Sequence, residues 1–123
     1  MIDTELMYRL LDGARLANGG PYSVERIARR YHQELPAEQA PEPDILIANA
    51  LILVDLLKQL GFVENSHHHE TGTAEDAKRL TVDGQHLLGL LHDPAFVAAL
   101  QALPLRADRD SVLATIAQFS AKG

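Results

Sequence analysis

The sequence has no cysteine and no tryptophan, and aromatic residues make up only 5% of it. Without cysteine the chain can form no disulfide, no thiolate zinc site and no thiol-based active site. Long hydrophobic runs are also lacking, because Asn49 and Asp55 interrupt the most apolar stretch, 45–57, which is too short to span a bilayer. The opening segment MIDTELMYRL does not have the basic residues followed by an apolar run of a secretory signal. We therefore expect a cytoplasmic protein that makes no membrane contact.

Positive charge is scarce as well. The chain has 11 lysines and arginines against 17 aspartates and glutamates, which gives a formal net charge of −6. Acidic and basic residues balance within 1–35, so the rest of the chain carries the whole negative excess. Because sequence-independent affinity for DNA comes mainly from neutralising phosphates, this charge disfavours nucleic acid as a partner.

Hydrophobic residues make up 46% of the chain, which is enough to build the core of one domain over 1–123. Apolar residues at helical spacing predict helices over about 3–18, from Ser23 onward, and over 44–60. Residues 35–43 read LPAEQAPEP, and the prolines predict an extended linker between the second and third helices.

The second half of the chain predicts a hairpin followed by further helices. Residues 62–64 and 78–81 are typical of short strands, joined by a long polar loop. Thr81 is suited to cap the next helix, and Pro94 to start another, since proline is favoured in the first turn of a helix. A last helix is expected from about residue 108.

Two short motifs flank the predicted hairpin. The third helix ends in Leu60, Gly61 and Phe62, and the returning strand enters the next helix through Arg79, Leu80, Thr81 and Gly84. This passage resembles the helix, wing and helix of winged-helix proteins, in particular bacterial regulators of the PadR and MarR kind. The resemblance implies a mainly α, winged helix-turn-helix fold, with three helices and a β-hairpin wing over 1–92 and additional C-terminal helices over 93–123.

The chain is also similar to an uncharacterised family of small phage and bacterial proteins. It shares the start MIDTELMYRLL, the pattern RLTxxGxxxLxxxxDpxxx from Arg79 to Phe96 and the apolar last helix VLATIAQFSAK. It departs from the family in the second helix and the linker, and it has Leu53 where the family often has histidine. The resemblance implies a phage or mobile-element setting but no particular activity, since a fold does not fix a function.

Potential metal ligands cluster in the predicted loop, at His67, His68 and His69 with Glu70. Imidazole and carboxylate groups are ordinary ligands of divalent metals, but consecutive loop residues rarely converge on one ion. We therefore expect a solvated loop with no metal or other cofactor, and weak metal binding is the alternative.

Basic side chains concentrate in the second helix, at Arg26, Arg29, Arg30 and His32. They are suited to contact phosphate groups or an acidic partner. The simpler alternative is an ordinary solvated helix face.

Direct reading of DNA bases by the third helix would require side chains such as Arg, Lys, Asn or Gln. The helix offers only Asn49, Lys58 and Gln59, beside two aspartates, and the loop that would form the wing is acidic. Both elements that would face DNA are therefore apolar or negatively charged. A sequence-specific DNA-binding regulator is accordingly the second hypothesis.

Apolar residues also lie on the polar side of the third helix. Ala48, Leu51 and Ile52 share a sector of the helical wheel with Asp44 and Asp55, so they need a cover. That cover is either the C-terminal helices of the same chain or a second molecule. We predict that these helices and the third helix form a contact surface together. Its predicted residues are Ala48, Leu51, Ile52, Phe96, Val112 and Ile116.

No catalytic pattern is recognisable in the sequence. It has no glycine-rich phosphate loop and no paired acid and base, and Ser66, Ser111 and Ser120 lack the flanking residues of an activated serine. Our first hypothesis is a non-enzymatic accessory or regulatory protein that acts through protein contacts as a homodimer. A metal-dependent module built on the histidine loop is the third hypothesis.

Overall fold

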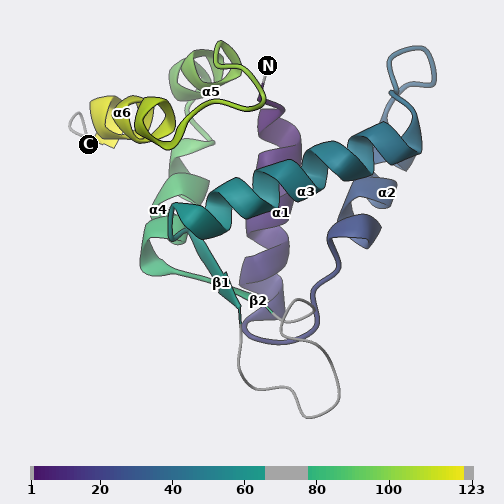
Figure 1. The fold of residues 1–123 in the computed structure, drawn as a ribbon, viewed down its shortest axis with the longest axis horizontal. Helices are drawn as coiled ribbons and strands as arrows, with labels where there is room; N and C mark the ends of the chain where they lie inside the picture. The colour runs from purple at the N-terminus through teal and green to yellow at the C-terminus, as the bar shows by residue number, and fades with distance from the viewer. Residues whose placement is uncertain (1, 66–77, 121–123) are drawn as a thin grey trace.

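A computed structural model describes residues 2–65 and 78–120 (Figure 1). This part of the chain forms helices and one two-stranded antiparallel hairpin, so the expected mainly helical class is confirmed. The elements follow one another as α1 (Thr4–Ala17), α2 (Val24–Glu34), α3 (Pro43–Gln59), β1 (Val63–Asn65), β2 (Lys78–Leu80), α4 (Val82–Leu90), α5 (Pro94–Gln101) and α6 (Arg109–Ser120). Among these helices, none has the length and hydropathy needed to cross a membrane.

Side-chain caps fix where most helices begin. The Asp3 carboxylate accepts a hydrogen bond from the Leu6 amide, and the Ser23 and Thr81 hydroxyls play the same part for α2 and α4. Helix α3 has no side-chain cap and begins instead at Pro43, whose missing N–H would find no partner in a first turn. It therefore starts one residue before the expected Asp44.

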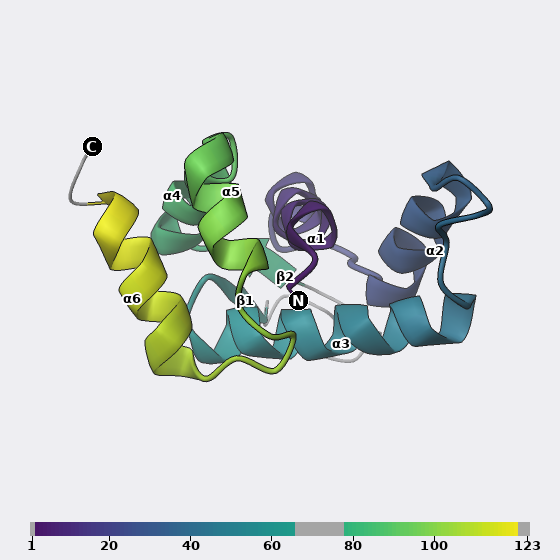
Figure 2. The ribbon, with the colours of Figure 1, turned by 90° about the horizontal axis from the view of Figure 1, so that it is seen from above.

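Helix α3 lies along one side of the molecule (Figure 2). It crosses α1 and packs against α2 along its first half, while α4, α5 and α6 gather at its other end (Figures 1 and 2). Helix α1 is the central element. Its buried residues are Thr4, Leu6, Met7, Leu10, Leu11 and Ala14.

The hairpin is tied to the turn between α1 and α2. Within the hairpin, Val63 pairs with Leu80 and Asn65 with Lys78. The backbone of Lys78 also exchanges hydrogen bonds with the turn: its carbonyl accepts from the Gly19 amide at 2.9 Å, and its amide donates to the Gly20 carbonyl at 3.3 Å. The turn thus hydrogen-bonds to β2 along the edge of the two-stranded sheet.

The junction between α3, the hairpin and α4 depends on two glycines and a threonine. Gly61 has a φ of 80°, which favours glycine, and it ends α3 as its position in the motif predicts. The Thr81 hydroxyl donates to the Gly61 carbonyl at 2.6 Å and accepts from the Gly84 amide at 3.0 Å. A Cβ atom on Gly84 would lie 2.1 Å from the Phe62 carbonyl oxygen, so α4 packs against the chain after α3 at a distance that only glycine allows.

The C-terminal helices are part of the same hydrophobic core as α1 and α3. Phe96 and Leu100 of α5 and Val112 and Ile116 of α6 are buried in it. At the far side, the Ile2 amide donates to the carbonyl of Leu103 at 3.0 Å, which joins the start of the chain to the segment after α5.

Candidate interaction surfaces

The outward side of α3 carries apolar residues between polar ends. Asp44, Ala48, Leu51 and Asp55 are exposed, and Ile52 beside them is half-buried; we call these five residues the α3 face. Leu51 is 52% exposed, and so is Ile45 next to the face. Spacings of three and four residues place the members of the α3 face on one side of the helix.

No described element covers the middle of the α3 face. The opposite side of α3 buries its large residues, Leu53 and Leu57 among them, against the rest of the core. The start of α6 reaches only the end of α3, where residues 107–110 line a surface hollow with Leu56 and Gln59. Of the two predicted covers for Ala48 and Leu51, the C-terminal helices therefore do not reach them within the described residues.

Three of the predicted contact residues lie elsewhere. Phe96, Val112 and Ile116 are buried in the core, where α5 and α6 pack on each other and α6 packs on α4. The structure corrects the expectation that they face a partner, because the apolar sides of these helices are used within the chain. Periodicity identifies the side that a helix buries but not the element that covers it.

Charge is distributed unevenly along α3. Asp44 lies in the first turn and Lys58 in the last, which places each charge where it complements the helix dipole. The Gln59 amide nitrogen donates to Asp55 at 2.7 Å, one helical turn away.

The residues proposed to read DNA bases do not form one surface. Asn49 and Lys58 are nine positions apart, which places them on opposite sides of the helix at about 100° per residue. Asn49 is half-buried, and the amide of Gln59 is already bonded to Asp55. The helix therefore does not present a joint set of hydrogen-bonding groups to a DNA groove.

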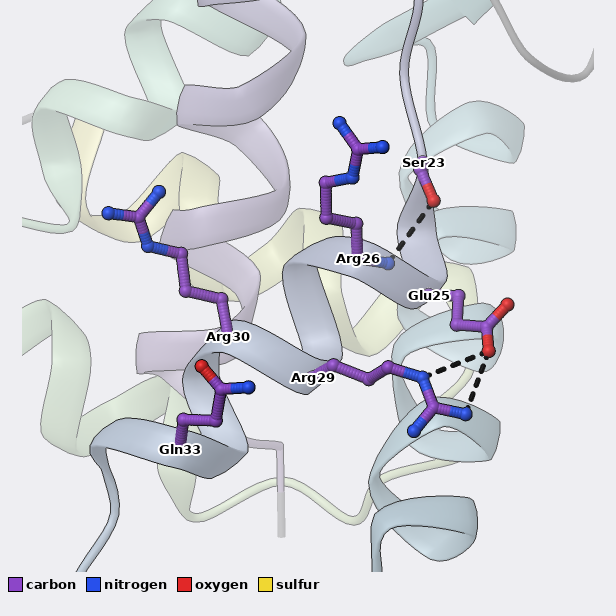
Figure 3. A pocket seen from close by; sticks show the side chains of 6 residues that line it. All are labelled: Ser23, Glu25, Arg26, Arg29, Arg30 and Gln33. Carbon is purple, nitrogen blue, oxygen red and sulfur yellow. Dashed lines mark hydrogen bonds and ion pairs between the residues drawn. The ribbon is translucent and has the colours of Figure 1, made fainter.

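A second surface lies on α2. Arg26, Arg29 and Arg30, which we call the α2 arginine strip, line a shallow hollow of about 700 Å³. The other residues that line it are Ser23, Glu25 and Gln33 (Figure 3). The predicted fourth member, His32, is half-buried and does not line the hollow.

The arginines of the strip differ in their partners. Arg29 forms an ion pair with Glu25 at 2.8 Å. The guanidinium groups of Arg26 and Arg30 extend to the same side of α2, away from that pair (Figure 3). Within residues 2–65 and 78–120, neither Arg26 nor Arg30 makes a side-chain hydrogen bond or close ion pair.

Beside the strip, acidic groups attach α2 to α1, and one of them, Glu34, lies one helical turn after Arg30 and attracts it electrostatically. Arg9 donates to Glu34 at 2.5 Å, and this bond lowers the pKa of Glu34. The Tyr31 hydroxyl donates to the Asp3 carboxylate at 3.2 Å. Burial raises the pKa of Tyr31 to about 12, and the negative charge of Asp3 adds to the rise.

One contact was missed by the sequence reasoning. His86 Nε2 of α4 lies 2.8 Å from Ser120 Oγ of α6. Ser120 Oγ also lies 2.8 Å from the Ile116 carbonyl oxygen, so in the tautomer with a proton on Nε2, His86 donates to Ser120 while the Ser120 hydroxyl donates to Ile116. The pair ties the end of α6 to α4. The two residues are 34 positions apart, so no local pattern could have shown their contact.

Metal ligands do not gather in the part of the chain that the structure describes. There, no three histidine, aspartate or glutamate side chains are placed to hold an ion together. The predicted histidine cluster, His67, His68 and His69, lies outside the described residues.

Comparison of the chain with protein-family models, curated proteins and solved structures gives no match.

Proposed function

We propose that the chain is a non-enzymatic protein of winged-helix type that acts through protein contacts as a homodimer. Three features support the winged-helix part of this proposal. The hairpin follows α3 directly. The turn between α1 and α2 hydrogen-bonds to its strand β2, and α4 packs against the same strand. One feature departs from the winged-helix pattern: residues 35–42 make the α2–α3 connection longer than the turn of most helix-turn-helix motifs. The resemblance of its motifs supports a role as an accessory or regulatory factor of a phage or mobile element.

The exposed α3 face is the observation that carries the protein-contact role. Leu51 and Ala48 lie open to solvent in the middle of the longest helix among the described residues, where burial against a partner would be favourable. An acidic and apolar face of this kind suits another polypeptide better than a polyanion.

A second copy of the chain fits the α3 face. If two α3 helices pair antiparallel about a twofold axis between Leu51 and Ile52, each Leu51 meets the partner's Ile52. In the same register Asp44 lies opposite the partner's Lys58, offset by one residue or about 1.5 Å along the axis. Apolar residues then meet at the centre and opposite charges at both ends, so the face is complementary to itself.

Sedimentation velocity of the wild-type chain and a Leu51→Glu variant tests this proposal. We expect the wild type to sediment as a dimer. In the variant, the two Glu carboxylates would meet without partners near the twofold axis. The dissociation constant of the dimer should therefore rise at least about 100-fold.

Val82→Glu is the matched control, because Val82 is 83% exposed on α4, away from the α3 face. This variant should remain dimeric, and circular dichroism should show both variants folded. A monomeric wild type, or equal dissociation of the two variants, would disprove the dimer.

The alternative of a sequence-specific DNA-binding regulator has less support. Its base-reading candidates, Asn49 and Lys58, lie on opposite sides of α3, while Asp44 and Asp55 occupy the exposed side. A gel-shift experiment at low salt that gave a defined complex, lost on Lys58→Ala, would favour this alternative.

A further inference from the structure

The groove between α1 and α2 joins an apolar hollow to the α2 arginine strip. Leu16, Pro21 and Ile27 are among the residues that line this hollow, which has a volume of about 590 Å³. Ser23 and Arg26 line both it and the cationic hollow on α2, so the two form one continuous surface. No α3 residue lines either hollow, and this surface is separate from the α3 face.

Leu16 makes the apolar part of the groove accessible. It is 69% exposed, whereas Leu6, Leu10 and Leu11 of the same helix are fully buried. A single exposed leucine is common on protein surfaces. Here, however, Pro21 is exposed beside it and Ile27 is half-buried, so an apolar side chain of a ligand would find several partners in one place.

The cationic part of the groove has charge left to offer. Glu25 and Glu34, the acidic residues of α2, are bound to Arg29 and Arg9 respectively, and Glu34 also attracts Arg30 electrostatically without a close ion pair. The guanidinium groups of Arg26 and Arg30, one helical turn apart, point away from the Arg29–Glu25 pair (Figure 3). In a chain of net charge −6, this strip is a local site of positive charge that complements carboxylates.

We infer that the groove between α1 and α2 binds an acidic segment of a protein partner that carries a large apolar side chain. The apolar side chain lies in the hollow beside Leu16 and Ile27, and neighbouring carboxylates pair with Arg26 and Arg30. A nucleic acid fits less well, because its phosphates would leave Leu16 exposed and would meet long-range repulsion from the rest of the chain.

Selection from a random peptide library displayed on phage tests this inference. We expect the enriched peptides to place aspartates or glutamates beside a Leu, Ile, Phe or Trp residue. A synthetic copy of the most enriched peptide should then shift the NMR signals of Leu16, Arg26 and Ile27. The double variant Arg26→Gln/Arg30→Gln should weaken its binding by about tenfold, because two pairs at the rim are lost.

Arg106→Gln/Arg109→Gln is the matched control, since both arginines are exposed at a distance from the groove and precede or begin α6. It should leave the affinity unchanged, as should exchange of Leu51 for glutamate on the α3 face. Failure to enrich acidic peptides, or signal shifts confined to α3, would overturn the inference. It would also be overturned if a short DNA duplex bound more tightly than the peptide and lost that binding in the Arg26→Gln/Arg30→Gln variant.

Discussion

At the scale of single residues, the motif after the hairpin is explained by close packing. Thr81 caps α4 as the sequence predicts, and Gly61 has the positive φ that its place after α3 requires. The reason for Gly84 could not be predicted, because it depends on a carbonyl group of Phe62, far away in the sequence. A pattern shows that a glycine is present, but only the fold shows which atom needs the space.

Replacement of Gly84 by alanine tests this account. The new Cβ would lie 2.1 Å from the Phe62 carbonyl oxygen, so α4 must move away from the end of α3. We expect the free energy of unfolding to fall by about 2–3 kcal/mol, as for other overpacked sites. Denaturant unfolding followed by circular dichroism measures the change.

Gly89→Ala in the same helix is the control. Apart from its chain neighbours and the backbone of its own helix, no atom lies within 4 Å of the position of its Cβ, so alanine should be neutral or should stabilise α4 by up to about 1 kcal/mol. Equal destabilisation by both substitutions would show that helix flexibility, and not the contact with Phe62, explains Gly84.

At the scale of elements, periodicity predicts the helices and their order well but not their neighbours. The expected strands and helices appear within a few residues of their predicted bounds. The burial of Phe96, Val112 and Ile116 within the chain could not be predicted, because an amphipathic helix buries its apolar side equally well against its own core or a partner. The exposure of Leu51 has the same cause, since α6 packs on α5 and α4 and leaves the middle of α3 open.

The attachment of α6 depends on a few side chains near its end. The rings of Phe119 and Phe96 meet edge to face with centroids 5.4 Å apart, and His86 bonds to Ser120 beside them. We expect Phe119→Ala to lower the free energy of unfolding by about 2 kcal/mol, a modest loss because Phe119 is only half-buried. The substitution should loosen α6 before the rest of the core. Hydrogen exchange should then show faster exchange in α6, while α1 keeps its protection.

Leu113→Ala serves as the comparison for this substitution. Leu113 is 39% exposed on α6 and is not among the buried residues of the core, so its truncation should change exchange much less. If Phe119→Ala instead opened α1 and α6 equally, α6 would be part of the same cooperative unit as the central helix.

At the scale of the whole molecule, charge determines which pairing of two copies is favourable. Net charge of −6 on each chain opposes association at long range, so the proposed dimer requires local attraction at the α3 face. An antiparallel arrangement provides it by placing Asp44 opposite Lys58 at both ends, whereas a parallel arrangement would place each Asp44 beside its own copy. In the proposed dimer, the orientation therefore depends on two charges that the sequence alone could not relate to each other.

Exchange of these charges tests the orientation. In the Asp44→Lys variant, two cations would meet at each end of the antiparallel pair, and the dissociation constant should rise by about tenfold. Lys58→Asp should have the same effect, and the double variant Asp44→Lys/Lys58→Asp should restore the affinity, since opposite charges again face each other. Sedimentation equilibrium at low and high salt measures all three, and the differences should shrink as salt screens the charges.

Arg106→Asp is the control for the change in net charge, because Arg106 is exposed outside α3. It alters the charge of each chain as Lys58→Asp does and should leave dimerisation nearly unchanged. A double variant that dissociates more readily than either single variant would rule out the antiparallel register, since only antiparallel helices bring residues 44 and 58 of different chains together.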